Sequence, residues 1–410
     1  MALNYVWIAF FVISFAVALF RLVFMGDAEI FGKMTTALFD SGKTGAELAL
    51  GLTGMMAFWL GIMKIGERAG MIALFAKGVN PLFSRLFPGI PKGDPAMGSV
   101  VMNFSANALG LDNAATPMGL KAMKELQELN PQKDTASNAQ IMFLVLNTAG
   151  ITMIPTAVMA MRLTQGAANP ADIFIPTMIG TFISFISGMI AVAIYQRINL
   201  FRLPVLVFVG GFIGLMGLLF LWMRNMPTEE IAVKTAMLGG IIIFSVIVSF
   251  LLVAFRQKIN VYDAFIEGAK EGFTTAVMII PYLVAILVGI AVFRASGCLD
   301  VIINGISWLV ALAGLNTDFV PALPVGIMKI FSGGGARGVM VELMETYGAD
   351  SFVGRLACIM QGSTETTFYV LALYFGSVNI KNTRYALTCG LIADVAGIIA
   401  AIIIGYIFFH

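Results

Sequence analysis

The stretch Met360-Gln361-Gly362-Ser363-Thr364-Glu365-Thr366-Thr367-Phe368-Tyr369 (MQGSTETTFY) places polar side chains and one carboxylate inside apolar sequence. Its flanks, FVGRLACI and VLALYFG, are largely apolar. A charge at the centre of a membrane helix is costly, so an intramembrane carboxylate indicates function by default. The alternative is that Ser, Thr and Gln hydrogen-bond across helices and only hold them together. The fold depends on what surrounds this stretch.

The composition is that of an integral membrane protein. The 410 residues are 59% hydrophobic and 12% charged, whereas soluble domains are about a quarter charged. The net charge of +2 favours no nucleic-acid partner. Cys298, Cys358 and Cys389 are scattered and form no CxxC pair, and the single histidine is His410. We therefore expect no disulfide framework, no metal site, no other cofactor and no histidine-based catalysis.

Nine apolar segments are long enough, or nearly so, to cross a bilayer, which takes about 20 residues. The first has no basic residue before it and no cleavage site after it, so we expect a retained membrane segment and not a signal peptide. Between the segments, Met71–Phe87 is amphipathic and predicted to lie at the membrane interface. The nine are Leu3–Phe20, Leu48–Met63, Ala139–Met161, Ile173–Tyr195, Pro204–Met223, Thr235–Phe255, Phe273–Phe293, Leu356–Tyr374 and Tyr385–Phe409.

The chain repeats itself, with chance matching as the alternative explanation. Four groups of identities share an offset of 226 residues: Phe39 and Gly42 with Phe265 and Gly268, Arg68-Ala69 with Arg294-Ala295, Pro95-Ala96 with Pro321-Ala322, and Met102 with Met328. Further on, LVLNTAGIT (144–152) lies over CIMQGSTET (358–366) by pattern. We predict repeats at 1–200 and 201–410, with the extra segment 204–223 linking them.

The number of segments predicts how the repeats are oriented. Four segments precede the linking one, so the second repeat enters the membrane from the opposite side, as in many secondary transporters. With the N-terminus in the cytoplasm, the inner loops hold 15 of the 25 Lys and Arg residues, which the positive-inside rule favours. We therefore expect a cytoplasmic membrane location, with the N-terminus inside and the C-terminus outside.

Two apolar pieces are too short to cross the membrane, Pro95–Leu111 and Phe319–Ala336. Both end in small and polar residues, and they occupy matching positions in the two repeats. We predict two re-entrant hairpins whose tips meet a ligand, because irregular backbone at membrane depth must be buried in protein or line a wet cavity. A surface loop with a glycine turn is the alternative. The tip residues are Asn103, Ser105 and Asn107, then Ser332, Gly333, Gly334 and Gly335, with Arg337 beyond them.

The matched stretches LNTAGIT and QGSTET predict two helices that are broken inside the membrane. Gly150, Pro155 and Gly362 are helix breakers, and the backbone groups freed at a break become ligand sites. The polar residues there are Asn147, Thr148 and Thr152 on one helix, and Gln361, Ser363, Thr364, Glu365 and Thr366 on the other. Asp394 is a second intramembrane acid; pairing with Arg337 or Arg355 and a role in proton transfer are both open for it.

Two motifs resemble known families. NFSANALGLDNAATPMGLKAMKELQ (103–127) resembles the signature of the spore maturation A proteins. GSTETTFYVLALYFGSVN (362–379) resembles that of the spore maturation B proteins, so the chain looks like a fusion of the two, joined near 199–204. Both belong to the wider Gate, or nucleoside-recognition, group, which includes concentrative nucleoside transporters. In those transporters, a Gln-Thr-Glu cluster and Asn or Ser residues on broken helices bind substrate and sodium. QGSTE (361–365) is similar but has two more residues, so individual roles do not carry over.

These observations together predict an all-α integral membrane protein of about nine segments, two re-entrant hairpins and two inverted Gate repeats. We expect a secondary transporter, not an enzyme, that moves a small polar solute resembling a nucleoside, amino acid or peptide. Coupling is expected to Na⁺ or H⁺, with Na⁺ near the broken helices and Glu365 contacting the ion or a substrate amine. A homo-oligomer in the lipid bilayer is compatible with this reading. The alternatives are an intramembrane enzyme with a second carboxylate near Glu365, or a non-transporting protein of cell-envelope (peptidoglycan) maturation.

Overall fold

The chain is helical throughout the residues that the structure describes. The structure is a computed structural model that describes residues 2–108, 112–152, 155–223 and 228–410. Helices make up 80% of the chain, and the described residues contain no strand. Three predictions touch positions outside the described residues: Met1 as the cytoplasmic end, Leu109, Gly110 and Leu111 in the first hairpin, and Met153 and Ile154 in the third membrane segment.

The helices occur in two successive sets that are separated by one helix, α9 (Leu203–Met223). The first set is α1 (Ala2–Met25), α2 (Ile30–Arg68), α3 (Met71–Leu86), α4 (Pro95–Ala108), α5 (Asp112–Glu128), α6 (Asn138–Thr148), α7 (Thr156–Thr164) and α8 (Phe174–Gln196). The second set is α10 (Thr228–Arg256), α11 (Val261–Ala295), α12 (Cys298–Leu312), the 3₁₀ turn η1 (Val320–Ala322), α13 (Leu323–Phe331), α14 (Gly333–Tyr347), α15 (Phe352–Ser363), α16 (Thr367–Ser377) and α17 (Ala386–Phe409).

The two sets share the same order of elements and the same start signals. Gly70 and Gly297 have positive φ angles of 68° and 87°, which suits glycine, and they come directly before α3 and α12. Ser137 and Ser351 cap α6 and α15, because each hydroxyl accepts a hydrogen bond from a backbone amide of the first turn. Equivalent helices therefore begin at equivalent residues in the two halves.

The longest helices, α2 and α11, pack against each other along their length and run antiparallel. Near the end of α2, Lys64 forms ion pairs with Glu267 and Glu271 near the start of α11. A Cβ atom added to Gly272 of α11 would lie 2.5 Å from the carbonyl oxygen of Met56, so this contact admits only glycine without movement. With 39 residues, α2 is about 58 Å long and exceeds the roughly 30 Å bilayer core.

The predicted membrane segments differ from the observed helices in several places. Within the described residues, three helices are long and apolar enough to cross a membrane, in the ranges Trp7–Met25, Phe174–Gln196 and Ala386–Phe409. The pair Leu287–Ala295 and Cys298–Leu312 would count as a fourth, although it is bent by 75°. The predicted segments Leu48–Met63 and Phe273–Phe293 lie within the longer helices α2 and α11. Two others, Ala139–Met161 and Leu356–Tyr374, are interrupted.

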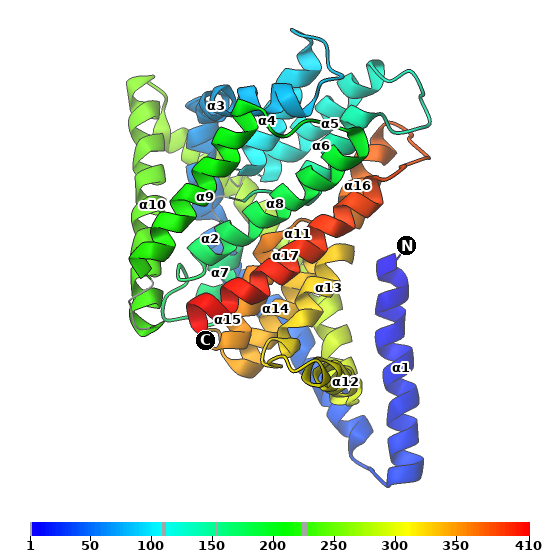
Figure 1. The fold of residues 1–410 in the computed structure, drawn as a ribbon. Helices are drawn as coiled ribbons and strands as arrows, with labels where there is room; N and C mark the ends of the chain where they lie inside the picture. The colour runs from blue at the N-terminus through cyan, green and yellow to red at the C-terminus, as the bar shows by residue number, and fades with distance from the viewer. Residues whose placement is uncertain (1, 109–111, 153–154, 224–227) are drawn as a thin grey trace.

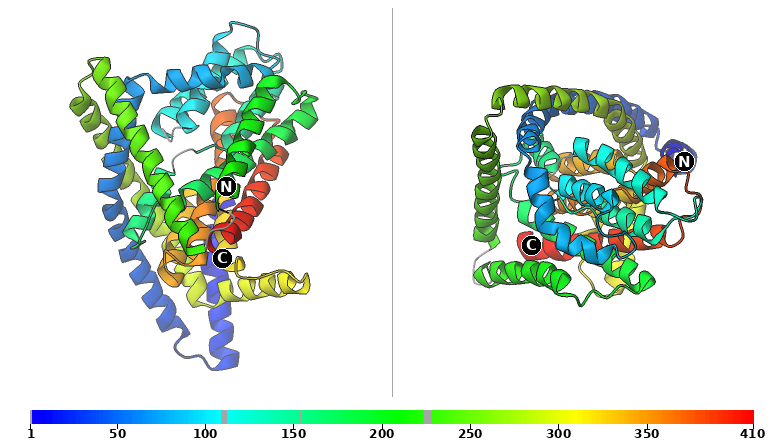
Figure 2. Two further views of the ribbon diagram at one scale, coloured as in Figure 1. Left: turned by 60° about the vertical axis from the view of Figure 1, so that its left-hand side comes forward. Right: turned by 90° about the horizontal axis from the view of Figure 1, so that it is seen from above.

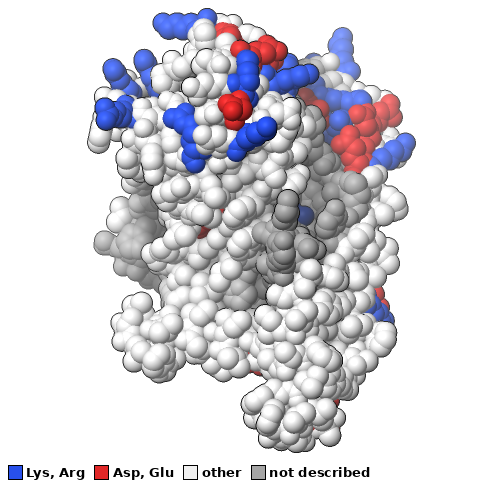
Figure 3. All heavy atoms as spheres, turned by 90° about the vertical axis from the view of Figure 1, so that its right-hand side faces the viewer, with Lys and Arg blue, Asp and Glu red and all other residues white. Residues whose placement is uncertain are grey.

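Charged side chains gather at one end of the molecule. Figure 3 shows Lys, Arg, Asp and Glu side chains concentrated at the top of the face it displays, with very few over the middle and the bottom. In Figure 1 this end carries α3, α4 and α5. In Figure 2, α1 extends away from the main body, and much of its surface is exposed and apolar. A largely uncharged band below this charged end is what a membrane protein requires, since charges are costly in lipid.

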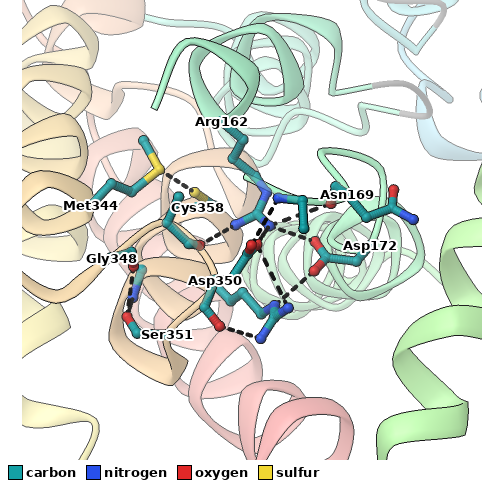
Figure 4. A network of polar contacts seen from close by, with 12 residues as sticks. Arg162, Asn169, Asp172, Met344, Gly348, Asp350, Ser351 and Cys358 are labelled. Atoms are coloured by element: carbon teal, nitrogen blue, oxygen red, sulfur yellow. Dashed lines mark hydrogen bonds and ion pairs between the residues drawn. The ribbon is translucent and has the colours of Figure 1, made fainter. Parts of the chain in front are cut away.

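A buried cluster of charges joins the two halves (Figure 4). Arg162 at the end of α7 is completely buried and lies 2.9 Å from both Asp172 and Asp350. Its Nη1 atom also donates a hydrogen bond of 2.7 Å to the carbonyl oxygen of Ala349. Arg355 completes the cluster with a 2.7 Å ion pair to Asp172. The cluster fixes α7 of the first half against the start of α15 in the second.

Candidate functional site

The two predicted helix breaks are present and lie against each other. Between Thr148, where α6 ends, and Thr156, where α7 begins, Gly150 has a φ angle of 27°. In the second half, α15 ends at Ser363 and α16 begins at Thr367. The backbone amide of Glu365 donates a hydrogen bond of 2.8 Å to the carbonyl oxygen of Thr148. The two breaks are thus joined directly through backbone groups, as expected where helices end inside a protein.

Two helical hairpins pack beside these breaks, at the places where re-entrant hairpins were predicted. The first is α4 with α5, and the second is α13 with α14, which turns at Ser332. The hydroxyl of Ser332 accepts a hydrogen bond of 3.0 Å from the amide of Gly335, so Ser332 caps α14. A Cβ atom at Gly333 would lie 2.9 Å from Oγ1 of Thr366, which places the second hairpin tip against the break in the second half.

A polar cavity of about 50 Å³ lies at the breaks, large enough for a few water molecules. Three charged side chains line it, from three different elements. Nζ of Lys329 on α13 lies 3.9 Å from Oε2 of Glu365. Arg337 on α14 forms no ion pair or hydrogen bond with any other described residue. The remaining lining residues are Thr152, Pro155, Thr156, Ala157, Val158, Gln361, Gly362 and Thr364.

Of the predicted site residues, five line this cavity: Thr152, Arg337, Gln361, Thr364 and Glu365. Nδ2 of Asn107 donates a hydrogen bond of 2.8 Å to Oδ1 of Asn147, so these two meet each other instead. Together with Asn103 and neighbouring aromatic rings they line a separate cavity of about 10 Å³. The first hairpin therefore meets the first broken helix at a second, smaller polar spot.

The other predicted residues are buried in packing contacts. Ser105 and Ser363 each donate a hydrogen bond to a carbonyl of their own helix, at 2.7 Å to Val101 and 2.5 Å to Ile359. Thr148 and Thr366 are buried between the breaks. The glycines of the second tip, Gly333, Gly334 and Gly335, form the first turn of α14; Gly335 is buried, and the other two are half-buried. Whether any of these contacts a ligand stays a prediction.

Glu365 is more accessible than an intramembrane carboxylate was expected to be. Its side chain is 48% exposed, whereas Gln361 and Thr364 beside it are 2% and 5% exposed. The carboxylate thus faces the cavity, and the neighbouring polar side chains are buried around it. Its charge is therefore available to a ligand.

Asp394 has neither of the arginine partners considered for it. Arg355 pairs with Asp172 and Asp350. Asp394 instead accepts a hydrogen bond of 2.6 Å from the hydroxyl of Thr367, a residue outside the predicted site. Sequence reasoning also missed Lys329, although a lysine within the apolar run VGIMKIF is the same kind of signal that identified Glu365.

Two helical hairpins that pack beside two broken helices in an all-helical protein, with a polar cavity at the breaks, are an arrangement typical of membrane transport proteins. The comparison with protein families agrees: the Gate family, described as nucleoside recognition, matches residues 49–164 and 276–381. The chain belongs to this family, which is described by a recognition role and not by an enzymatic activity, and which indicates a role related to membrane transport.

Two curated relatives match different parts of the chain, as expected of a fusion. Spore maturation protein A of Bacillus subtilis (strain 168) is 39% identical over 187 residues, which are 46% of this chain and 92% of the relative. Spore maturation protein B of the same organism is 46% identical over 159 residues, 39% of this chain and 88% of the relative. No solved structure matches the chain. The resemblance to both spore maturation proteins is thus confirmed.

Proposed function

We propose that the protein is a secondary active transporter that binds one small polar organic solute between the two breaks, in the cavity of about 50 Å³, which would widen to admit the solute when the two halves move. The observation that carries this proposal is the cavity itself, since its charged residues come from both broken-helix and hairpin elements. Lys329 and Arg337 come from the second hairpin, and Glu365 from the break in the second half. Thr152 comes from the break in the first half. A movement of one half relative to the other would open or close such a site.

Antiparallel packing of equivalent helices supports inverted repeats. α2 and α11 are equivalent and antiparallel, as described above. α8 and α17 are equivalent too, and Tyr195 at the end of α8 stacks on Tyr385 at the start of α17. Repeats related by an axis in the membrane plane produce such pairs, and transporters use them for alternating access. We retain the boundary near residue 200, with α9 as the link, and a cytoplasmic N-terminus in the cell membrane.

The charges of the cavity indicate the class of solute. Lys329 and Glu365 partly neutralise each other at 3.9 Å, which leaves the guanidinium of Arg337 without a partner among the described residues. A guanidinium is a good partner for carboxylates and phosphates, because it offers paired donors. We infer a solute with one anionic group, and an amine that faces Glu365 would fit an amino acid or a peptide. A nucleoside would need to carry phosphate to use Arg337.

Glu365 is the one carboxylate among the residues that line the cavity, all of which the structure describes. An enzyme that uses a pair of carboxylates as acid and base would need a second one at hand. The cavity therefore favours binding over this kind of catalysis.

A thermal-shift screen of the purified protein in detergent tests the proposal. Amino acids, dipeptides, nucleosides, nucleoside monophosphates and cell-wall fragments are the probes. A solute at 100 times its Kd stabilises the folded state by about 2.7 kcal/mol. Arg337→Gln should abolish the shift given by an anionic probe, and Arg202→Gln, at an exposed arginine on the surface, should not. If no probe raises the melting temperature, or Arg337→Gln leaves the shift unchanged, the proposal is wrong.

A further inference from the structure

The carboxyl group of Asp394 is the most deeply buried acid near the two breaks. It is 0% exposed in the middle of α17. Oδ2 accepts the 2.6 Å hydrogen bond from Thr367, whereas Oδ1 is buried without a hydrogen-bond partner among the described residues. Burial of an ionised carboxylate is strongly unfavourable unless its charge is balanced. Two charged groups act on Asp394, the ammonium of Lys329 on α13 and the carboxylate of Glu365, and these two oppose each other at 3.9 Å. Oδ1 is therefore open to a small cation.

A second unpartnered oxygen belongs to Thr148, at the last turn of α6. Its hydroxyl is buried and has no hydrogen-bond partner within the part of the chain that the structure describes. Thr148 and Thr367 both pack over Gly390, one turn before Asp394: a Cβ atom there would lie 3.5 Å from Cγ2 of Thr148 and 3.0 Å from Cγ2 of Thr367. A larger residue at position 390 would press on Thr367 first. The side chains of Thr148 and Thr367 thus lie together against the face of α17 that carries Asp394, and the hydroxyl of Thr367 contacts its carboxyl group directly.

The surrounding backbone also favours positive charge. α6 ends at Thr148, and the C-terminal end of a helix carries a partial negative charge from its free carbonyl groups. Carboxylate, hydroxyl and carbonyl oxygens are the ligands preferred by small hard cations. A cation can bind where several oxygen atoms lie together without enough hydrogen-bond donors to satisfy them.

We propose that Asp394, with Thr148 and Thr367, binds one monovalent cation, either a proton or Na⁺, and that this is the coupling ion of the transporter. The coupling role rests on the proposed transport function, whereas cation binding at this site does not depend on it. Asp394 does not line the solute cavity, so the cation site is distinct from it. This assigns to Asp394 the ion-binding role that the sequence suggested for Glu365.

A backbone contact connects the proposed cation site to the solute cavity. Thr148 would offer its hydroxyl to the cation, and its carbonyl oxygen already accepts the hydrogen bond from the amide of Glu365. Thr367, on the other side, directly follows the break that contains Glu365. Cation binding would therefore hold the two breaks together at the wall of the solute cavity. A solute that contacts Glu365 would in turn favour the arrangement that binds the cation.

The test measures the melting temperature of the purified full-length protein without any solute. One series replaces K⁺ by Na⁺ at constant ionic strength and alkaline pH, and a second lowers the pH in K⁺ alone. The wild type should be stabilised in a saturable way by Na⁺ or by protons. Asp394→Asn should remove that response, while the matched Asp40→Asn, at an exposed aspartate on α2, should retain it. The neutral asparagine mimics the occupied state, so this variant should fold and should melt no lower than the cation-free wild type.

Thr148→Val distinguishes the two cations. It should weaken a Na⁺ response by about tenfold or more, as removal of an oxygen group at an ion site commonly does, and it should leave a proton response nearly intact. A wild type that responds to neither cation, or an Asp394→Asn variant that responds like the wild type, overturns the proposal. Because no solute is present, failure of the solute screen alone would refute the proposed function and leave the cation site standing.

Discussion

Replacing Arg162 should destabilise the protein strongly, because this buried side chain holds the charge cluster that joins the two halves. Arg162→Met keeps an unbranched apolar stem but removes the ion pairs to Asp172 and Asp350, both at 2.9 Å, and the hydrogen bond to Ala349. Asp172 is 2% exposed and would keep only Arg355 as a partner. Breaking a buried pair by removing one member costs about 3–5 kcal/mol, because it leaves an uncompensated charge.

The measurement is a thermal unfolding curve in detergent, followed by intrinsic fluorescence. At about 2 °C per kcal/mol or less for a chain of this length, the melting temperature should fall by several degrees. Arg202→Met, at an exposed arginine, is the control and should change it little. The double variant Arg162→Met/Asp172→Asn should lose less than the sum of the single losses, since both charges are then absent. Equal melting temperatures for Arg162→Met and Arg202→Met would refute the reasoning.

Two further changes test the packing and the cavity. Gly272→Ala should cost about 1–3 kcal/mol in folding free energy, because its methyl group would meet the backbone of α2 at Met56. The control Gly54→Ala, with open space around it, should be neutral or slightly stabilising. Equal melting temperatures for the two variants would contradict the close approach of α11 to α2. Glu365→Gln should change stability by less than about 1 kcal/mol, because the ion pair with Lys329 is half exposed. It should nevertheless weaken the binding of an amine-bearing solute by about 1.5–3 kcal/mol. Unchanged binding in the thermal-shift assay would show that Glu365 is not part of the site.

The sequence predicted the helix breaks because glycine and proline act locally. Gly150 and Pro155 lie within the first break, whereas Gly362 is still in α15 and precedes the second break, which begins after Ser363. Glycine and proline disfavour helix, and the polar residues around them have few other uses inside an apolar segment. The hairpins were predictable for a similar reason, since short apolar pieces that end in small residues cannot cross a bilayer. These features depend on neighbours in sequence and not on the tertiary structure.

The partners of the charged residues could not be predicted in this way. Arg162 and Asp350 are 188 residues apart, and only the packing of α7 against α15 brings them together. Asp394 was compared with arginines because sequence shows charge but not distance; its actual partner, Thr367, is a neutral residue that had seemed unremarkable beside Glu365. The number of membrane segments stays a prediction, because hydropathy does not distinguish a crossing from part of a longer helix, as in α2 and α11.

The central claim is that the cavity is reached from each side of the membrane in turn. Single cysteines test it directly, with Thr152→Cys in the cavity and Leu315→Cys in the exposed loop between α12 and η1. The wild type, whose Cys298, Cys358 and Cys389 are all buried, gives the background of labelling. We predict that a membrane-impermeant thiol reagent labels Thr152→Cys in both right-side-out and inverted vesicles, and Leu315→Cys in one orientation only. Labelling of Thr152→Cys from one side alone under every ionic condition, or from neither side, would contradict alternating access.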